Sequence, residues 1–390
     1  MNVDTLLDRI TADEVVHVCR DLVRFRTVNP PGDEQPAADY ALAFLRQTGF
    51  EGDLVPHGEN RASLIARLKG KREIPALVFN GHLDVVPVGA GRWRHDPFEG
   101  VVAEGKVWGR GSADMKGGVA AMLVAAQAVA TSGLNLRGDL VFVATAGEEV
   151  DMLGARVIAA RPDLGLLQAV IISEPTSNRI GLAERGVFWL EFTTHGKTAH
   201  GSTPELGNNA ITLMRTLLDE LDRLSIPYTP HPVLGHFTRS INTIQGGIQT
   251  NVVPDHCAVT VDMRTVPGQD HRALLRQLED LIADLTHKAL NFQASVRLVS
   301  DLPAVETPPD EPVIQRFRDV MLQVTGKPPE PQVVRFATEA AIFVPALSVP
   351  TIICGPGNAD LAHQPDEYIE IDKMVEAARM YALAAAQLLA

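Results

Sequence analysis

Two kinds of hydrophobic pattern alternate along the first 180 residues. Short apolar runs bounded by turn residues predict strands that are covered on both faces, as in a parallel sheet. Apolar residues at helical spacing lie between these runs. The predicted strands span residues 64–68, 76–79, 140–144 and 169–172, and the predicted helices span residues 11–26, 36–48 and 117–130. This alternation predicts an α/β/α sandwich around a largely parallel sheet.

The pattern changes after residue 181, where strict alternation of apolar and polar positions predicts half-buried strands. These strands span residues 187–194, 240–244, 258–264 and 294–299, with amphipathic helices over 209–224 and 271–285. The resulting order β-α-β-β-α-β is that of a ferredoxin-like α+β unit. A helix over 313–325 and an apolar strand over 351–354 then return to the first pattern. We therefore predict one domain formed by residues 1–180 and 297–390, with a second domain, 181–296, inserted into it.

Composition limits the classes of protein to consider. A chain of 390 residues is long enough for two domains. Its net charge of −13 argues against a nucleic-acid partner and against binding to an anionic membrane. The three cysteines lie among apolar residues and predict buried thiols in a reducing compartment. The N-terminal residues lack the apolar core of a signal peptide, and no apolar run is long enough to span a bilayer. We expect a cytoplasmic protein.

Five acidic or imidazole side chains sit where an apolar, strand-like run ends in a glycine-rich or polar turn. They are His82, Asp114, Glu149, Glu174 and His363. Parallel sheets place ligand sites just beyond the carboxyl ends of their strands, so these side chains are expected to meet. Two histidines and three carboxylates form a nitrogen and oxygen set suited to Zn²⁺. Five ligands are too many for one open catalytic zinc, and they suit a pair of zinc ions that share one carboxylate.

Two further carboxylates accompany this set. Asp84 follows His82 at a spacing of two, which allows it to accept a hydrogen bond from the far side of the imidazole. Glu148 precedes Glu149, and because neighbouring side chains diverge, one can bind metal while the other acts as a general base. Each residue also has a simpler explanation, such as a surface turn, a helix cap or an acidic helix start. The coincidence of five such residues at successive strand ends favours the metal site.

Six stretches of the sequence resemble, in order, one family of di-zinc amide hydrolases, that of acetylornithine deacetylase, succinyl-diaminopimelate desuccinylase and carboxypeptidase G. The stretches are GHLDVVPVGAGRWRHDPFEGVVAEGKVWGRGSADMKGG, ATAGEE, ISEPT, HGKTAHGSTPELGNNAI, TNVVPDHCAVTVDMRTVPG and GPGNADLAHQPDEY. The resemblance implies two Zn²⁺ per subunit, which Co²⁺ can replace.

The same resemblance implies a role for each residue of the site. His82 and Glu174 hold one zinc, Glu149 and His363 hold the other, and Asp114 bridges them. Asp84 is implied to orient His82, and Glu148 to act as the base. The inserted domain corresponds to the family's lid, which is also its dimerisation surface, so a homodimer is implied.

Residues of the inserted domain also match family positions. His200 aligns with a histidine that reaches across the dimer to the scissile carbonyl; its alternative is a solvated loop histidine. Asn251 and Arg264 match positions that contact substrate, and an arginine suits bidentate binding of a carboxylate. The alternative for Arg264 is an ion pair with Asp262.

The resemblance implies cleavage of the amide bond of a small N-acyl amino acid by attack of a zinc-bridging water. Glu339, in the motif ATEAAIF, is placed in the substrate pocket, where its charge would favour a cationic amino group, as in N-acetylornithine. If Glu339 only bonds to neighbouring backbone, this preference disappears. Desuccinylation of succinyl-diaminopimelate and a carboxypeptidase or aminoacylase activity are the alternatives. A metal-free binding or scaffold protein on the same fold is the alternative from another class, and the intact set of ligands argues against it.

Overall fold

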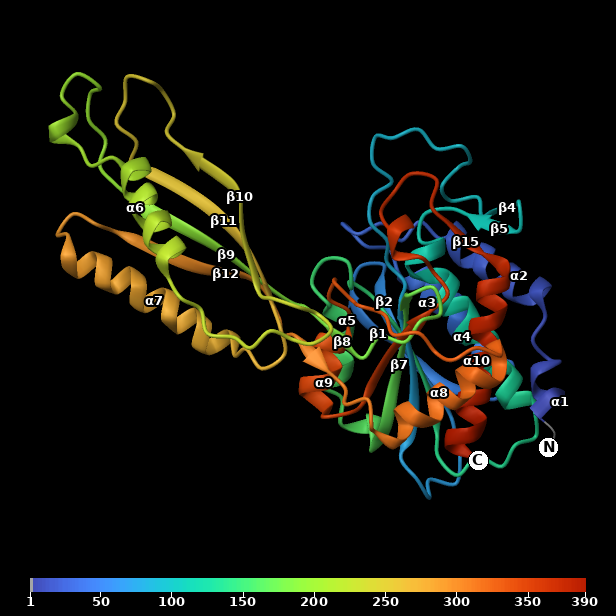
Figure 1. Ribbon diagram of the computed structural model, residues 1–390. Helices are drawn as coiled ribbons and strands as arrows, with labels where there is room; N and C mark the ends of the chain where they lie inside the picture. The colour runs from blue at the N-terminus through green and yellow to red at the C-terminus, as the bar shows by residue number, and fades with distance from the viewer. Residues whose placement is uncertain (1–2) are drawn as a thin grey trace. The chain divides into compact units, whose positions relative to one another are not determined.

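The computed structural model describes residues 3–390 and divides into two compact units (Figure 1). Unit 1 comprises the chain up to Leu182, together with Thr307–Val333 and Thr338–Ala390. Unit 2 comprises Ala183–Glu306 and the short segment Val334–Ala337. The predicted boundary at residue 296 is wrong because it falls inside strand β12 (Ala294–Leu302), which pairs with its neighbour as far as Leu302.

Unit 1 is built on a six-stranded sheet with the order β1-β2-β6-β3-β7-β14. Its strands are β1 (Glu51–Gly58), β2 (Arg61–Leu68), β3 (Ala76–His82), β6 (Leu140–Thr145), β7 (Leu167–Pro175) and β14 (Thr351–Gly355). The four strands from β6 to β14 are parallel, whereas β2 and β1 are added antiparallel. The predicted α/β architecture is confirmed, with a mixed rather than wholly parallel sheet.

Helices cover this sheet, and α4 (Gly117–Thr131) is the most deeply buried of them. It is apolar nearly all round, as its sequence predicts, and it packs beside α2 (Ala12–Arg24) and α10 (Ile371–Leu389). A Cβ atom on Gly118 would lie 2.2 Å from the Ser173 hydroxyl oxygen, so a glycine is needed for α4 to approach β7 this closely.

The other helices complete the covering of unit 1. Helix α3 (Gln35–Arg46) packs on β1 and β2, and α8 (Pro312–Thr325) packs on α10. Helices α5 (Leu153–Ala159) and α9 (Ala340–Leu347) contact each other, and α1 (Val3–Leu7) contacts α10.

Short elements lie in the loops of unit 1, most of them beyond the carboxyl ends of the strands. Strands β4 (Val101–Ala103), β5 (Lys106–Trp108) and β15 (Tyr368–Glu370) form a small separate sheet. A π-helical turn, η1 (Ser112–Lys116), leads into α4, and the 3-10 turns η2 (Pro162–Leu164) and η4 (Ala359–Leu361) lie in other loops. These short segments carry no clear hydrophobic period, which is why periodicity does not predict them.

Unit 2 has the predicted order β-α-β-β-α-β. Its elements are β9 (Gly186–His195), α6 (Ala210–Arg223), β10 (Thr238–Gly246), β11 (His256–Thr265), α7 (His271–Lys288) and β12. The four strands form an antiparallel sheet in the order β10-β11-β9-β12, as in a ferredoxin-like unit. Phe188 and Val261 on the sheet pack with Leu217 of α6 and Leu278 of α7 in one apolar core.

The remaining elements of unit 2 are short. Strands β8 (Ala183–Glu184) and β13 (Val305–Glu306) pair with each other, and η3 (Pro204–Leu206) lies in the loop before α6.

Two further findings concern the cysteines and the length of the helices. Cys19, Cys257 and Cys354 are buried free thiols, as their apolar neighbours predict. Of the helices formed by residues 3–390, none combines the length and the apolar character that crossing a bilayer requires.

Candidate metal centre

The residues predicted to bind metal all lie in unit 1, most of them at or beyond the carboxyl ends of the parallel strands. His82 is the last residue of β3, and Glu174 is the penultimate residue of β7. Glu149 follows β6, Asp114 lies in η1, and His363 follows η4 in the loop after β14. The strand-end pattern in the sequence therefore corresponds to one edge of the sheet.

Asp114 lies between the two histidines. One of its oxygens, Oδ1, is 3.1 Å from His82 Nε2, and the other, Oδ2, is 3.6 Å from His363 Nε2. His363 Nε2 is also 3.1 Å from Glu149 Oε2. Ligand atoms of His82, Asp114 and Glu149 lie within 4.8 Å of one another. The two oxygens of Asp114 thus face one histidine each.

Glu174 and Glu148 complete the cluster. Glu174 is buried, and its Oε1 has no hydrogen-bond partner within the described part of the chain. Glu148 Oε2 is 4.0 Å from His82 Nε2. Across residues 3–390 the Glu148 carboxylate makes no side-chain hydrogen bond, so it stands beside the ligands without being tied to them.

Burial and the mutual repulsion of carboxylates govern the pKa values of the glutamates in this cluster. Burial raises the pKa of Glu148 and of Glu174 well above the usual range, and the neighbouring carboxylates raise both further. Burial also raises the pKa of Glu149, although a hydrogen bond to His363 opposes this. A cation among these groups would remove the repulsion between them.

The two histidines respond to the same carboxylates. Burial alone would lower the pKa of His82, but the hydrogen bond that its Nε2 donates to Asp114 and the nearby carboxylates raise it well above its usual value. The hydrogen bond to Glu149 raises the pKa of His363. The cluster thus combines an unpaired oxygen on buried Glu174, carboxylates that repel one another and two imidazole nitrogens. This combination fits divalent cations such as Zn²⁺.

Asp84 does not orient His82 in the expected way. His82 Nδ1 donates to the backbone carbonyl of Asp84 at 3.0 Å, whereas the Asp84 carboxylate oxygen Oδ1 is 3.7 Å from the ring. That carboxylate instead accepts hydrogen bonds from backbone amides of the loop after β6. The tautomer of His82 is therefore set by a carbonyl, which leaves Nε2 free to bind metal.

Glu367 and Arg110 belong to the site but were not predicted. Glu367 Oε1 accepts the backbone amides of Ala113 at 2.9 Å and Asp114 at 3.1 Å. Its Oε2 accepts from Arg110 Nη1 at 2.5 Å, and both side chains are buried. This ion pair fixes the loop that carries Asp114. The motif HQPDEY places Glu367 four residues after His363, and this proximity to a ligand could have indicated it.

Glu339 is not in the position we expected. Its side chain is 0 % exposed, and its Oε2 accepts a hydrogen bond from the Thr145 hydroxyl at 2.8 Å. Burial raises the pKa of Glu339 to about 7. This burial argues against a place in the substrate pocket, because the start of α9 turns this side chain inward toward the end of β6.

The other predicted residues lie in unit 2. His200 is exposed, and its Nδ1 accepts the backbone N–H of Ser202 at 3.1 Å, so a neutral His200 carries its proton on Nε2. Asn251 is exposed beside it, and its carbonyl accepts from the amide of Gly201 at 2.8 Å.

Arg264 follows the alternative interpretation. Its Nε and Nη2 lie 2.9 Å and 3.1 Å from the two oxygens of Asp262. The expectation that this guanidinium is free to take a substrate carboxylate is not met in this structure, because an acid two residues away on the same strand already occupies it.

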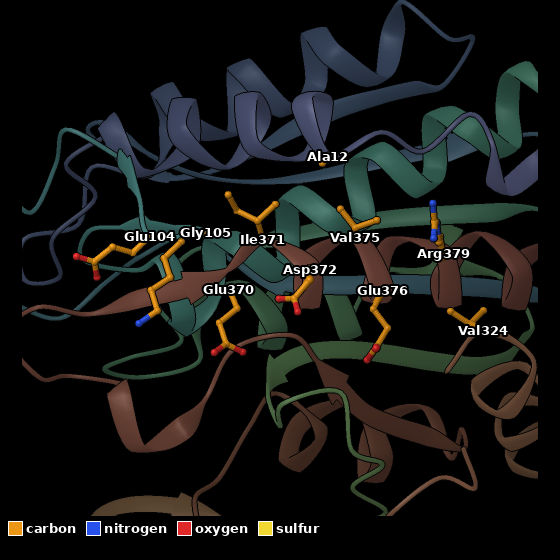
Figure 2. A pocket seen from close by; sticks show the side chains of 11 residues that line it. Ala12, Glu104, Gly105, Val324, Glu370, Ile371, Asp372, Val375, Glu376 and Arg379 are labelled. Atoms are coloured by element: carbon orange, nitrogen blue, oxygen red, sulfur yellow. The ribbon is translucent and has the colours of Figure 1, made fainter. Parts of the chain in front are cut away.

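A separate hollow of about 740 Å³ opens at the start of α10 (Figure 2). The side chains of Glu370, Asp372 and Glu376 lie along the beginning of α10, and Arg379 lies further along this helix (Figure 2). No residue of the predicted site lines this hollow among the described residues, so its size does not make it the reaction site.

Comparison with known proteins agrees with the chemistry of this cluster. Residues 78–387 match the model of peptidase family M20/M25/M40. The chain is 34 % identical over 339 residues to an acetylornithine deacetylase of Proteus mirabilis, covering 84 % of this chain and 83 % of that one. It is 28 % identical over 395 residues to a probable succinyl-diaminopimelate desuccinylase of Staphylococcus epidermidis, covering 93 % and 95 %.

The fold is also similar to that of a solved structure. An M20 family metallo-carboxypeptidase of Sulfolobus solfataricus superposes with a TM-score of 0.80 at 18 % identity, over 96 % of this chain and 99 % of that one. The family is metal-dependent, with centres that are typically dinuclear. Because the family model covers most of the sequence, this protein belongs to peptidase family M20/M25/M40, whose members are metal-dependent enzymes that hydrolyse amide bonds.

Proposed function

We propose that this protein hydrolyses the amide bond of an N-acyl amino acid at a centre that holds two zinc ions. The observation that carries the proposal is the position of Asp114 between His82 and His363, with an untethered Glu148 alongside. One metal position is assigned to His82 and Glu174, and the other to Glu149 and His363. Asp114 serves both positions.

The residues around the centre then have distinct tasks. When bound, the zinc ions would supply Lewis-acid polarisation of the substrate carbonyl and make water a stronger acid. Glu148 takes the proton of the attacking water on its carboxylate and returns it to the leaving nitrogen. The hydrogen bond from His82 Nδ1 to the Asp84 carbonyl keeps the ring oriented throughout. The buried Glu367–Arg110 pair keeps the Asp114 loop in place.

Replacing the two adjacent glutamates should separate base from ligand. Glu148→Gln should retain both metals and lose about 10²–10⁴-fold in kcat, the usual contribution of a general base. Glu149→Ala should lose occupancy of one metal position, because Glu149 Oε2 lies 3.1 Å from Nε2 of the other proposed ligand, His363. Turnover numbers and metal content after dialysis measure both effects. Near-normal kcat in Glu148→Gln would place the base elsewhere.

An N-acetylated amino acid is the proposed substrate, with N-acetylornithine first. The 34 % identity to an acetylornithine deacetylase supports this order, and the longer match to a desuccinylase, at 28 % identity, supports the alternative. Buried Glu339 no longer argues for a cationic group on the substrate. An aminoacylase or carboxypeptidase activity is the third candidate.

A panel of four substrates tests this order. The substrates are N-acetylornithine, N-succinyl-diaminopimelate, N-acetylmethionine and an acyl-glutamate, each assayed for kcat/KM with the zinc-loaded protein. We expect N-acetylornithine to give the highest value, by about tenfold or more, which corresponds to about 1.4 kcal/mol of transition-state discrimination. Preference for the succinylated substrate would reverse the order and leave the hydrolytic mechanism in place.

We further propose that unit 2 forms a homodimer in which His200 of one subunit serves the centre of the other. Strand β10 is an edge strand whose Ile244 is 59 % exposed, and such an edge can pair with another chain. His200 offers a proton on Nε2 that could stabilise an oxyanion.

Subunit mixing tests whether His200 of one subunit acts at the centre of the other. His200→Ala and Glu148→Gln should each be nearly inactive alone. After exchange of subunits, some hybrid dimers hold one centre with both residues intact, so activity should reappear, up to about one quarter of the wild-type value by random assortment. Mass spectrometry verifies that the subunits have exchanged. If activity does not recover after verified exchange, His200 does not act across the dimer.

A further inference from the structure

We propose that Asp84 and Asn29 form a clamp that fixes the main chain of residues 147–149 and so positions Glu148 and Glu149. The clamp is defined by the side chains of these two residues. Asp84 is then a positioning residue for the loop after β6, in addition to its contact with the His82 ring. The inference rests on the proposed roles of Glu148 as base and Glu149 as metal ligand.

Four donors converge on the Asp84 carboxylate. Its Oδ1 accepts the backbone N–H groups of Gly147 and Glu148, both at 3.0 Å. Its Oδ2 accepts the N–H of Glu149 at 3.2 Å and the side-chain Nδ2 of Asn29 at 2.9 Å. The Asp84 side chain is 0 % exposed, so water does not compete for these bonds.

A carboxylate suits this arrangement because both of its oxygens accept and neither carries an amide N–H. Backbone amides can only donate, and a carboxylate offers about four acceptor positions on two oxygens. An asparagine at position 84 would present an N–H₂ group to at least one of these donors. Bonds to a charged acceptor inside the protein are stronger than neutral ones.

Asn29 is itself held firmly. Its backbone N–H donates to the carbonyl of Val85 at 2.9 Å, and the N–H of Val85 donates to the carbonyl of Thr27 at 2.9 Å. Val28 and Val85 form a parallel bridge. The clamp therefore ties the segment before residue 30 and the segment after β3 to the loop after β6, although the three are far apart in sequence.

The loop needs such an anchor because two reactive side chains depend on its path. Gly147 has φ of +84°, a left-handed conformation that turns the chain away from β6. From there Glu148 extends toward His82 and Glu149 extends toward His363. A shift of this backbone would move base and ligand together, and a misplacement of about 1 Å can cost about 10²-fold in rate.

The Asp84 carboxylate makes no hydrogen bond of comparable length to the imidazole of His82. His82 Nδ1 already donates to the Asp84 carbonyl at 3.0 Å, and the carboxylate is 3.7 Å from the ring. A substitution that keeps the backbone, such as Asp84→Asn, leaves the His82 hydrogen bond intact while weakening the clamp. The two roles can thus be separated by experiment.

Amide hydrogen exchange, read by mass spectrometry on the full-length protein with and without zinc, tests the clamp. Asp84→Asn should speed exchange at residues 147–149 by about tenfold or more, because bonds to a charged acceptor are lost. Asn29→Ala, which removes one of four donors, should give a smaller increase at the same residues. The exchange at residues 80–83 should stay within about twofold of wild type.

Kinetics provide a second readout of the same variants. Asp84→Asn should lower kcat by about 10–100-fold while KM changes by less than about threefold, because the groups displaced are the base and a ligand and not the substrate contacts. Asn29→Ala should lower kcat less. Zinc should bind Asp84→Asn more weakly at the Glu149 position, seen as reduced metal content after dialysis.

Asp139→Asn is the matched control. Asp139 is a buried carboxylate that precedes β6 at its opposite end, where it accepts the amide of Gly70 at 2.9 Å and pairs with Arg67 at 2.8 Å. Its replacement should lower stability without speeding exchange at residues 147–149.

Unchanged exchange at residues 147–149 in Asp84→Asn and Asn29→Ala would overturn the clamp. Faster exchange confined to residues 80–83 would also overturn the clamp, and it would show that Asp84 mainly positions His82. If Asp84→Asn does not fold, Asn29→Ala carries the same comparison. Hydrogen exchange is measured without substrate, so it tests the clamp even if the proposed hydrolysis is not found. Conversely, failure of the clamp would leave the expected effect of Glu148→Gln on kcat unchanged.

Discussion

The concentration of buried acidic groups at one edge of the sheet is the constraint on which this structure depends. Burial raises the pKa of Glu148, Glu149 and Glu174, and the charge of the neighbouring Asp114 raises all three further. Left alone, such a cluster favours protonated carboxyls or protonated histidines. Divalent cations resolve the conflict by accepting the same oxygens as ligands, which makes the cluster a binding site.

The surrounding fold holds this unfavourable arrangement together. The central strands are hydrogen-bonded on both sides and covered by helices, so they fix the positions from which the loops start. Two further buried carboxylates then fix these loops by accepting hydrogen bonds from the main-chain amides of the loops. Asp84 holds the loop with Glu148 and Glu149, and Glu367 holds the loop with Asp114. His363 keeps φ of +65°, a left-handed conformation that is costly for a non-glycine residue and is typical of functional sites.

The sequence predicts those parts whose position follows from local pattern. Strands β3, β6 and β7 are covered on both faces, so their apolar runs reveal them, and the metal ligands follow because they end or succeed such runs. Strand β1 is half exposed and contains a proline and two glycines, so its pattern is weak. The role of Asp84 could not be predicted, because its partners lie more than 50 residues away in the sequence. The burial of Glu339 could not be predicted, because nearness in sequence to a ligand does not fix the direction of a side chain.

The stability of the metal-free and zinc-loaded protein between pH 5.5 and 8 tests the central claim most directly. Glutamates whose pKa is raised on folding keep protons that the unfolded chain releases near pH ~4.3, so the metal-free protein should lose stability as pH rises through the raised pKa values. The raised pKa of His82 acts in the same direction. Zinc replaces those protons, so the stabilisation that it provides, measured by urea unfolding, should grow with pH. A stabilisation by zinc that is absent, or that does not change between pH 5.5 and 8, would contradict the account.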